Sequence, residues 1–169
     1  GSNYVRLFRE QAGCSLKWCA DLDPERLDEL SAIYSGLKTT TDYEDILRDD
    51  EVDAVCIATP PGTHYELASS TLSHGKDILV EKPFPLDSEK AWDLQRQAED
   101  AGRIILVGHV FEYNTAVTEL RSLVRDGSLG DIHYVHAERT GLGPIRPDVS
   151  ALWDLAPHDI STYTFVLDD

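Results

Sequence analysis

Short apolar runs alternate with helical patterns through the first two thirds of the sequence, and this alternation constrains the fold more than any other feature. The expected strands are residues 15–20, 52–58, 77–80 and 103–107. The expected helices are residues 24–34, a short helix with a capped start at residues 41–45 that ends near residue 48, a helix that starts within residues 59–64 and runs to about residue 74, and residues 88–101. Residues 52–58 are almost continuously apolar, which is typical of a strand covered on both faces. Strands and helices in this order form a parallel, doubly wound sheet with right-handed crossovers. The sequence therefore predicts an α/β fold.

The composition excludes several classes of partner. The chain has 169 residues, 41% of them hydrophobic, so it can bury one good core and begin a second. A net charge of -16 repels nucleic acid and anionic membrane surfaces. The chain has three cysteines, Cys14, Cys19 and Cys56, and none of them forms a CxxC pair. We therefore expect them to be small buried residues of a protein in a reducing compartment. The apolar runs are too short to span a bilayer. We expect a cytoplasmic protein that binds no nucleic acid, no membrane and no metal.

The stretch Val80-Glu81-Lys82-Pro83 ends one of the expected strands. Because the residue before a proline is pushed out of the helical region, Lys82 is held at the carboxyl end of that strand. Open parallel sheets bind ligands outside the carboxyl ends of their strands, so chemistry is expected at this edge. An isolated Lys-Pro pair is more often an ordinary solvated lysine beside a turn. Other residues must therefore decide the role of Lys82.

Asp21 follows the expected strand at residues 15–20. An acidic residue at this place in a dinucleotide-binding fold accepts hydrogen bonds from the ribose hydroxyls and repels a 2′-phosphate, which favours NAD over NADP. Asp23 can act separately as the N-cap of a helix that begins at Pro24. Residues 1–13 precede this unit and are expected to form an amphipathic helix. Gly1 is either part of an expression remnant or the last glycine of a phosphate-binding turn.

The character of the sequence changes after Gly108. The expected elements are a helix, an alternating strand of an antiparallel sheet with one open face, and a further helix, at residues 115–125, 132–139 and 152–167. We therefore expect two domains. Residues 1–107 would form the first, and residues 108–169 would begin the second.

Asp154 and His158 are four residues apart, which places both side chains on one face of a helix. A histidine with a nearby carboxylate is suited to taking a proton from a hydroxyl group near neutral pH. On its own, such a pair is more often an exposed or satisfied helical histidine. Together with Lys82 it supplies a base, a carboxylate that orients the base or the substrate, and a cation that stabilises a developing alkoxide.

Four motifs occur in the order found in the Gfo/Idh/MocA oxidoreductase family, which the chain resembles along almost its whole length. They are Ala58-Thr59-Pro60-Pro61-Gly62-Thr63-His64, Glu81-Lys82-Pro83, Gly108-His109 and Asp154-Leu155-Ala156-Pro157-His158-Asp159. The opening residues 1–6 also look like the part of the family's GxGxxG loop that begins at its third glycine. Residues 108–114 and 139–158 resemble nucleotide-sugar 3-dehydrogenases, which act on UDP-N-acetylglucosamine or its uronic acid.

The resemblance implies an NAD-dependent sugar dehydrogenase, with NADP less favoured. It also implies an N-terminal Rossmann domain, whose first strand is missing here, and a C-terminal α/β domain with an open, largely antiparallel sheet that supports homo-oligomers. By motif match, Lys82, with a cis Lys-Pro bond, Asp154 and His158 are the catalytic residues. The implied cofactor-binding residues are Gly1, Asp21, Thr59, Pro60, His64, Glu81 and Lys82. Candidate substrate contacts are His109, Tyr113, Asn114, Arg139 and Arg146, although the arginines can equally be solvated surface residues.

Three functions follow from the resemblance. The first is oxidation of a secondary hydroxyl of a sugar or nucleotide sugar, the second is the same reaction on an inositol or free sugar, and the third is a non-catalytic dinucleotide-binding remnant. Folding alone does not require Lys82, Asp154 and His158 together, which favours an enzyme. Because the first two glycines of the phosphate loop and most of the second sheet are absent, we expect a fragment that is inactive alone.

Overall fold

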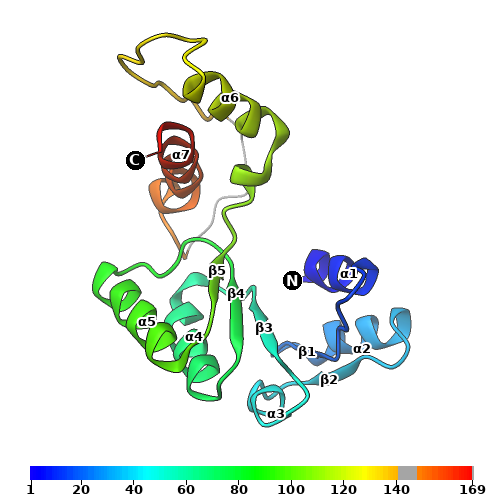
Figure 1. Ribbon diagram of the computed structural model, residues 1–169. Helices are drawn as coiled ribbons and strands as arrows, with labels where there is room; N and C mark the ends of the chain where they lie inside the picture. Colours follow the sequence, from blue (N-terminus) through cyan, green and yellow to red (C-terminus); the bar gives the residue numbers. More distant parts are fainter. Residues whose placement is uncertain (141–147, 169) are drawn as a thin grey trace.

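The computed structural model describes residues 1–140 and 148–168, and it has parallel strands with helices between them (Figure 1). The strands are β1 (Trp18–Ala20), β2 (Lys38–Thr40), β3 (Ala54–Ile57), β4 (Asp77–Val80) and β5 (Ile105–Val107). All pair in parallel, in one sheet of order β1-β2 and another of order β3-β4-β5. The carboxyl ends of β3, β4 and β5 therefore meet at one edge, and the predicted parallel α/β fold is confirmed.

The helices lie close to the positions that the sequence predicts. They are α1 (Ser2–Glu10), α2 (Pro24–Ile33), α3 (Glu44–Leu47), α4 (His64–Ser73), α5 (Ser88–Ala101), α6 (Thr115–Arg125) and α7 (Ala151–Leu167), with 3-10 turns η1 (Pro61–Thr63) and η2 (Val110–Tyr113). The Asp23 side chain accepts a hydrogen bond from the Glu25 amide, so Asp23 is the N-cap of α2 as expected. Gly102 ends α5 at a φ of 61°, a left-handed conformation that glycine adopts without strain.

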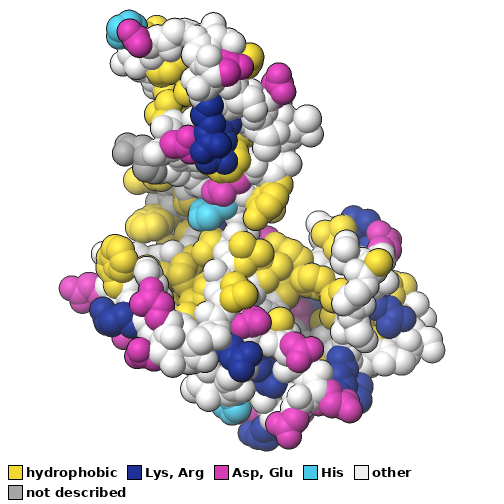
Figure 2. Space-filling view, viewed as in Figure 1, with side chains coloured by type: hydrophobic (Ala, Val, Ile, Leu, Met, Phe, Trp, Pro, Cys, Tyr) yellow, Lys and Arg dark blue, Asp and Glu magenta, His cyan; other side chains and the backbone are white. Residues whose placement is uncertain are grey.

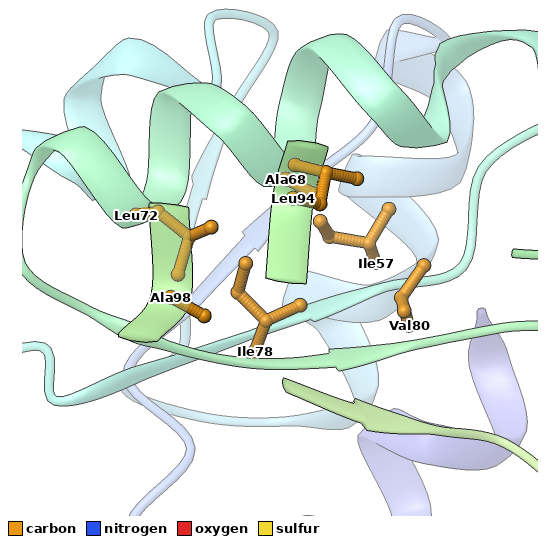
Figure 3. Packing of buried hydrophobic residues seen from close by; sticks show 7 residues of the cluster. All are labelled: Ile57, Ala68, Leu72, Ile78, Val80, Leu94 and Ala98. Carbon is orange, nitrogen blue, oxygen red and sulfur yellow. The ribbon is translucent and has the colours of Figure 1, made fainter. Parts of the chain in front are cut away.

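The main core lies between the sheet β3-β4-β5 and the helices α4 and α5 (Figure 3). Its buried residues come from four of these five elements, all but β5, and are Ile57, Ala68, Leu72, Ile78, Val80, Leu94 and Ala98. Ile78 and Val80 alternate along β4, so both face the two helices, and Leu94 of α5 has no exposed surface. This packing holds the carboxyl end of β4 in place.

Residues 132–139 do not form the predicted strand. Within the described residues beyond Gly108 there is no strand, and the predicted antiparallel sheet is therefore absent from this part of the structure. Ile132, Tyr134 and Val135 are 41%, 85% and 47% exposed. Alternation shows only that a segment suits a half-buried sheet, and a strand also needs a neighbour to which its backbone can bond.

The chain after β5 forms a second group of elements, in which α6 and α7 pack against each other and against η2 (Figure 1). Pro157 lies inside α7 without ending it, so Asp154 and His158 are on one continuous helix, as their spacing predicts. The domain boundary at residue 108 stays a prediction. No helix in the described part of the chain is both long and apolar enough to cross a membrane.

Candidate active site

Lys82 lies just beyond the carboxyl end of β4 and reaches the first turns of α7. Its Nζ donates hydrogen bonds to the Asp154 carboxylate Oδ1 and to the Asp154 carbonyl oxygen, both at 2.8 Å. The two side chains are 15% and 27% exposed, so the ion pair is largely shielded from solvent. The expected cis Lys82-Pro83 bond is present. Two residues 72 positions apart are thus joined at the sheet edge.

His158 follows Asp154 by one helical turn and packs against aromatic and cationic neighbours. Its ring meets the Phe111 ring edge-on, with the two centroids 4.8 Å apart. The Arg139 guanidinium lies 4.9 Å from the centroid of the same Phe111 ring, and its Nε donates to the Asp159 carboxylate at 2.8 Å. The structure therefore brings Arg139 into the same cluster as His158.

The charges around His158 favour its neutral form. Burial lowers the pKa of His158 below its ordinary value, the cations Lys82 and Arg139 and the nearby His109 lower it further, and Glu81 opposes them. Its Nδ1 is buried and has no hydrogen-bond partner among the described residues. A neutral imidazole is the form that can accept a proton from a hydroxyl group.

Hydrophobic side chains surround this edge. The space-filling view shows them gathered over the ends of β3, β4 and β5, below the group formed by α6 and α7 (Figure 2). Charged groups interact more strongly in such surroundings than in open water, because the local dielectric is lower. The ion pair is 15% and 27% exposed and His158 is half-buried, so these groups are partly shielded from solvent.

Glu81 connects the sheet edge to the first helix. Its Oε1 accepts a 2.6 Å hydrogen bond from the Tyr4 hydroxyl, and its Oε2 accepts one of 3.2 Å from the Lys82 backbone amide. Burial and the Glu81 carboxylate raise the pKa of Tyr4 above its usual range. Sequence reasoning missed this contact because Tyr4 stands 77 positions from Glu81, and the resemblance of residues 1–6 to a phosphate loop gives the Tyr4 side chain no role.

His64 is fully buried. Its Nδ1 lies 3.0 Å from the Pro83 carbonyl oxygen and its Nε2 lies 2.9 Å from the Thr59 carbonyl oxygen. The ring therefore connects the turn after β3 to the turn after β4, and the side chain is enclosed. Thr59 and Pro60, by contrast, are exposed at the end of β3. A role in cofactor binding stays a prediction for all three.

Other features of the structure fit a dinucleotide. Gly1 is the N-cap of α1, which has neither a side-chain cap nor an acidic residue in its first turn, so its first amides can bind phosphate oxygens. Asp21 follows β1 and is half-buried, with its Oδ1 accepting from the Asp23 amide at 3.0 Å and its Oδ2 3.6 Å from Arg26. A carboxylate has further lone pairs for ribose hydroxyls. Among the described residues, no cluster of His, Cys, Asp and Glu is arranged to hold a metal ion.

The predicted substrate residues divide into three groups. Arg139 and His109 lie close enough to His158 to lower its pKa. Tyr113 is 75% exposed, and the Asn114 side chain accepts from the Ala116 amide at 2.9 Å as the N-cap of α6. Arg146 lies outside the described residues. The structure therefore brings Arg139 and His109 to the candidate site, gives Asn114 a structural role, and leaves substrate contact a prediction for each.

Comparison with known protein families gives one match that covers most of the chain. The Gfo/Idh/MocA profile, described as an oxidoreductase family with an NAD-binding Rossmann fold, matches residues 1–109. A solved structure of a putative oxidoreductase from Magnetospirillum magnetotacticum MS-1 is similar with a TM-score of 0.88 and 33% identity, over 99% of this chain and 53% of that one.

Two curated relatives have names that describe enzymes acting on a polyol or on a nucleotide sugar. Inositol 2-dehydrogenase of Mycolicibacterium smegmatis is 29% identical over 174 residues, which cover 100% of this chain and 50% of the relative. UDP-N-acetylglucosamine 3-dehydrogenase of Acidithiobacillus ferrooxidans is 36% identical over 113 residues, which cover 65% of this chain and 34% of the relative. The chain thus spans half or less of the length of these relatives.

Proposed function

The chain belongs to the Gfo/Idh/MocA family of NAD-binding oxidoreductases, and on that premise we propose that the protein oxidises a secondary hydroxyl group of a sugar or nucleotide sugar. The observation that carries this proposal is the Lys82–Asp154 ion pair of 2.8 Å at the carboxyl edge of the sheet, one helical turn from His158. Such a combination of cation, carboxylate and imidazole is suited to moving a proton off a hydroxyl oxygen.

Each of the three residues has a separate task in this reaction. Neutral His158 accepts the proton of the reacting hydroxyl group. The Lys82 ammonium stabilises the negative charge that develops on the oxygen, and Asp154 holds that ammonium in place. When bound, NAD would supply the nicotinamide that takes the hydride from the carbon bearing the reacting hydroxyl group, so that loss of this hydride and of the hydroxyl proton would turn the alcohol into a ketone.

The first helix and the strand ends would hold the cofactor. In this proposal the first amides of α1, which begin after Gly1, bind the pyrophosphate, and Asp21 accepts hydrogen bonds from the adenosine ribose. Thr59 and Pro60 at the end of β3, with Glu81 at the end of β4, would hold the nicotinamide end of the cofactor. The negative charge of Asp21 favours NAD over NADP, because NADP would bring a phosphate close to it.

Two substrate classes are supported by different observations. Similarity to UDP-N-acetylglucosamine 3-dehydrogenase supports a nucleotide sugar, and the Arg139 guanidinium near His158 suits a substrate with anionic groups. Similarity to inositol 2-dehydrogenase, which extends over the whole chain, supports a cyclic polyol or free sugar as the second candidate. Homo-oligomers, a cytoplasmic location and a domain boundary at residue 108 belong to the same proposal.

A substrate panel tests the proposal in the protein as its natural source produces it. NAD or NADP is mixed with UDP-N-acetylglucosamine, its uronic acid or an inositol, and the reduced nicotinamide is measured. We expect reduction of NAD with one of these classes and its loss in His158→Gln. His74→Gln is the matched control, because His74 is an exposed residue at the end of α4. If NAD binds but no sugar or polyol reduces it, the protein is a non-catalytic dinucleotide-binding protein.

A further inference from the structure

We propose that Tyr4 is a positioning residue that couples the cofactor-binding helix α1 to Lys82 through the carboxylate of Glu81. This inference rests on the proposed function, because it concerns how the cofactor and the lysine are held relative to each other. Tyr4 belongs to the opening residues 1–6 that resemble the end of the phosphate loop, and the proposed catalytic step gives its side chain no task.

One carboxylate serves both sides of the connection. The Tyr4 hydroxyl donates to Glu81 Oε1 at 2.6 Å, and the Lys82 backbone amide donates to Glu81 Oε2 at 3.2 Å. The first turn of α1 and the backbone of Lys82 are therefore fixed to the same rigid group. A displacement of α1 would therefore move the Glu81 carboxylate, and with it the backbone segment that positions Lys82.

The rest of α1 has few anchors that could replace this bond. Val5 is its only buried residue within the described chain. Further along the helix, the exposed Arg9 side chain bonds the Ser35 carbonyl oxygen at 3.3 Å, which holds the opposite end of α1 from the proposed phosphate-binding amides. Tyr4 is thus the polar contact that fixes the first turn against the strand ends.

Gly108, the residue after β5, lies beside the same Glu81 carboxylate. A Cβ atom placed on Gly108 would lie 3.4 Å from Glu81 Oε2 and 3.5 Å from the Tyr4 hydroxyl oxygen, so the glycine backbone lies directly beside the hydrogen bond. Three elements, α1, β4 and β5, therefore meet at the Glu81 carboxylate.

The chemistry of the bond suits a permanent connection rather than a switch. Because the pKa of Tyr4 is raised, its hydroxyl remains a neutral donor at every pH at which the fold is used. A short bond from a hydroxyl to a carboxylate is among the stronger hydrogen bonds in proteins. A shift of about 1 Å in the cofactor relative to the reacting groups can cost about 100-fold in rate, so such a connection matters for catalysis.

A matched pair of variants separates positioning from general stability. Tyr4→Phe removes one hydroxyl that donates to a carboxylate. Tyr65→Phe removes the same kind of bond elsewhere, because the Tyr65 hydroxyl donates to Asp93 Oδ2 at 2.8 Å between α4 and α5. Both variants lose a similar contact, and only the first lies at the sheet edge.

The measurements are the Kd for NAD by calorimetry, kcat and KM for the sugar, and Tm. Both substitutions are made in the whole protein that the natural source produces, and each variant is compared with the unchanged protein. We expect Tyr4→Phe to raise the Kd for NAD about tenfold and to lower kcat about tenfold, with KM for the sugar changed less than about twofold. Tyr65→Phe should lower Tm by about as much as Tyr4→Phe does, because both lose one bond from a hydroxyl to a carboxylate. It should change kcat and the Kd for NAD by less than about twofold. Equal effects of the two variants on the Kd and on kcat would overturn the inference.

A double variant tests the bond itself. If Tyr4 acts through Glu81, the losses in NAD affinity of Tyr4→Phe and Glu81→Gln should not add when the two are combined. If the losses in NAD affinity of the two single variants add fully in the double variant, Tyr4 does not act through Glu81. The two proposals fail separately: absence of any turnover with bound NAD removes the proposed function, while the comparison of NAD affinities still decides the role of Tyr4.

Discussion

Replacing Asp154 by asparagine keeps the shape of the side chain and removes one negative charge from the Lys82 ion pair. The two charged atoms are 2.8 Å apart. With an effective dielectric constant of about 20, their attraction is about 6 kcal/mol before desolvation is subtracted. Desolvation cancels most of this gain, and the bond from Lys82 Nζ to the Asp154 carbonyl oxygen is unaffected. The net loss in free energy of unfolding is therefore about 1–3 kcal/mol.

The loss of activity should be much larger than this loss of stability. Without the carboxylate, the Lys82 ammonium is no longer held where charge develops on the substrate oxygen, so we expect kcat to fall by about 100-fold or more. The assay measures kcat for the sugar and Tm for the same preparation. A stability loss of this size lowers Tm by about 2–4 °C per kcal/mol and leaves the protein folded at the assay temperature.

Asp168→Asn is the matched control. Asp168 is the C-cap of the same helix and pairs with Arg121 at 2.6 Å. It lies fourteen residues beyond Asp154, or about 21 Å along a helix, and its φ of 58° is one that asparagine tolerates. We expect a comparable fall in Tm with kcat unchanged. The reasoning is refuted if Asp154→Asn retains kcat within about threefold, or if Asp168→Asn lowers kcat equally.

Three further changes test other parts of the structure. Lys82→Met removes a cation that lowers the pKa of His158, so that pKa should rise and the acid limb of kcat/KM should move to higher pH; a limb that stays in place would contradict this charge effect. Leu94→Ala empties a fully buried site in the core and should lower the free energy of unfolding in urea by about 2–5 kcal/mol. Leu22→Ala, at a residue that is 89% exposed, should lower it by less than about 0.5 kcal/mol. Equal losses in the two variants would argue against the described core. Asp21→Ser should lower the Kd for NADP relative to that for NAD, and an unchanged ratio would remove Asp21 from cofactor selection.

Local signals in the sequence predicted local structure well. The strand at residues 77–80, the N-cap Asp23 and the placement of Asp154 and His158 on one helix all follow from neighbouring residues, and all are present. The position of Lys82 also followed from its place between a strand and a proline. In each case the physical cause lies within about one helical turn or one strand of the residue concerned.

Contacts between distant segments were not accessible in the same way. Nothing in the sequence pairs Tyr4 with Glu81, and the enclosed position of His64 depends on the Pro83 and Thr59 carbonyl groups, which every residue possesses. The predicted strand at residues 132–139 failed for a related reason. Its alternation describes one face of a sheet, but pairing depends on a second strand that no local pattern can supply.

Transfer of a labelled hydride tests the proposed chemistry most directly. The sugar or inositol that supports turnover is prepared with deuterium on the carbon of the reacting hydroxyl group and is mixed with NAD and the protein as its natural source produces it. Deuterium should appear on the nicotinamide ring of the reduced cofactor, because the hydride leaves that carbon while His158 takes the hydroxyl proton. Deuterium that stays in the sugar or passes to water while NAD remains oxidised would contradict the proposed dehydrogenase.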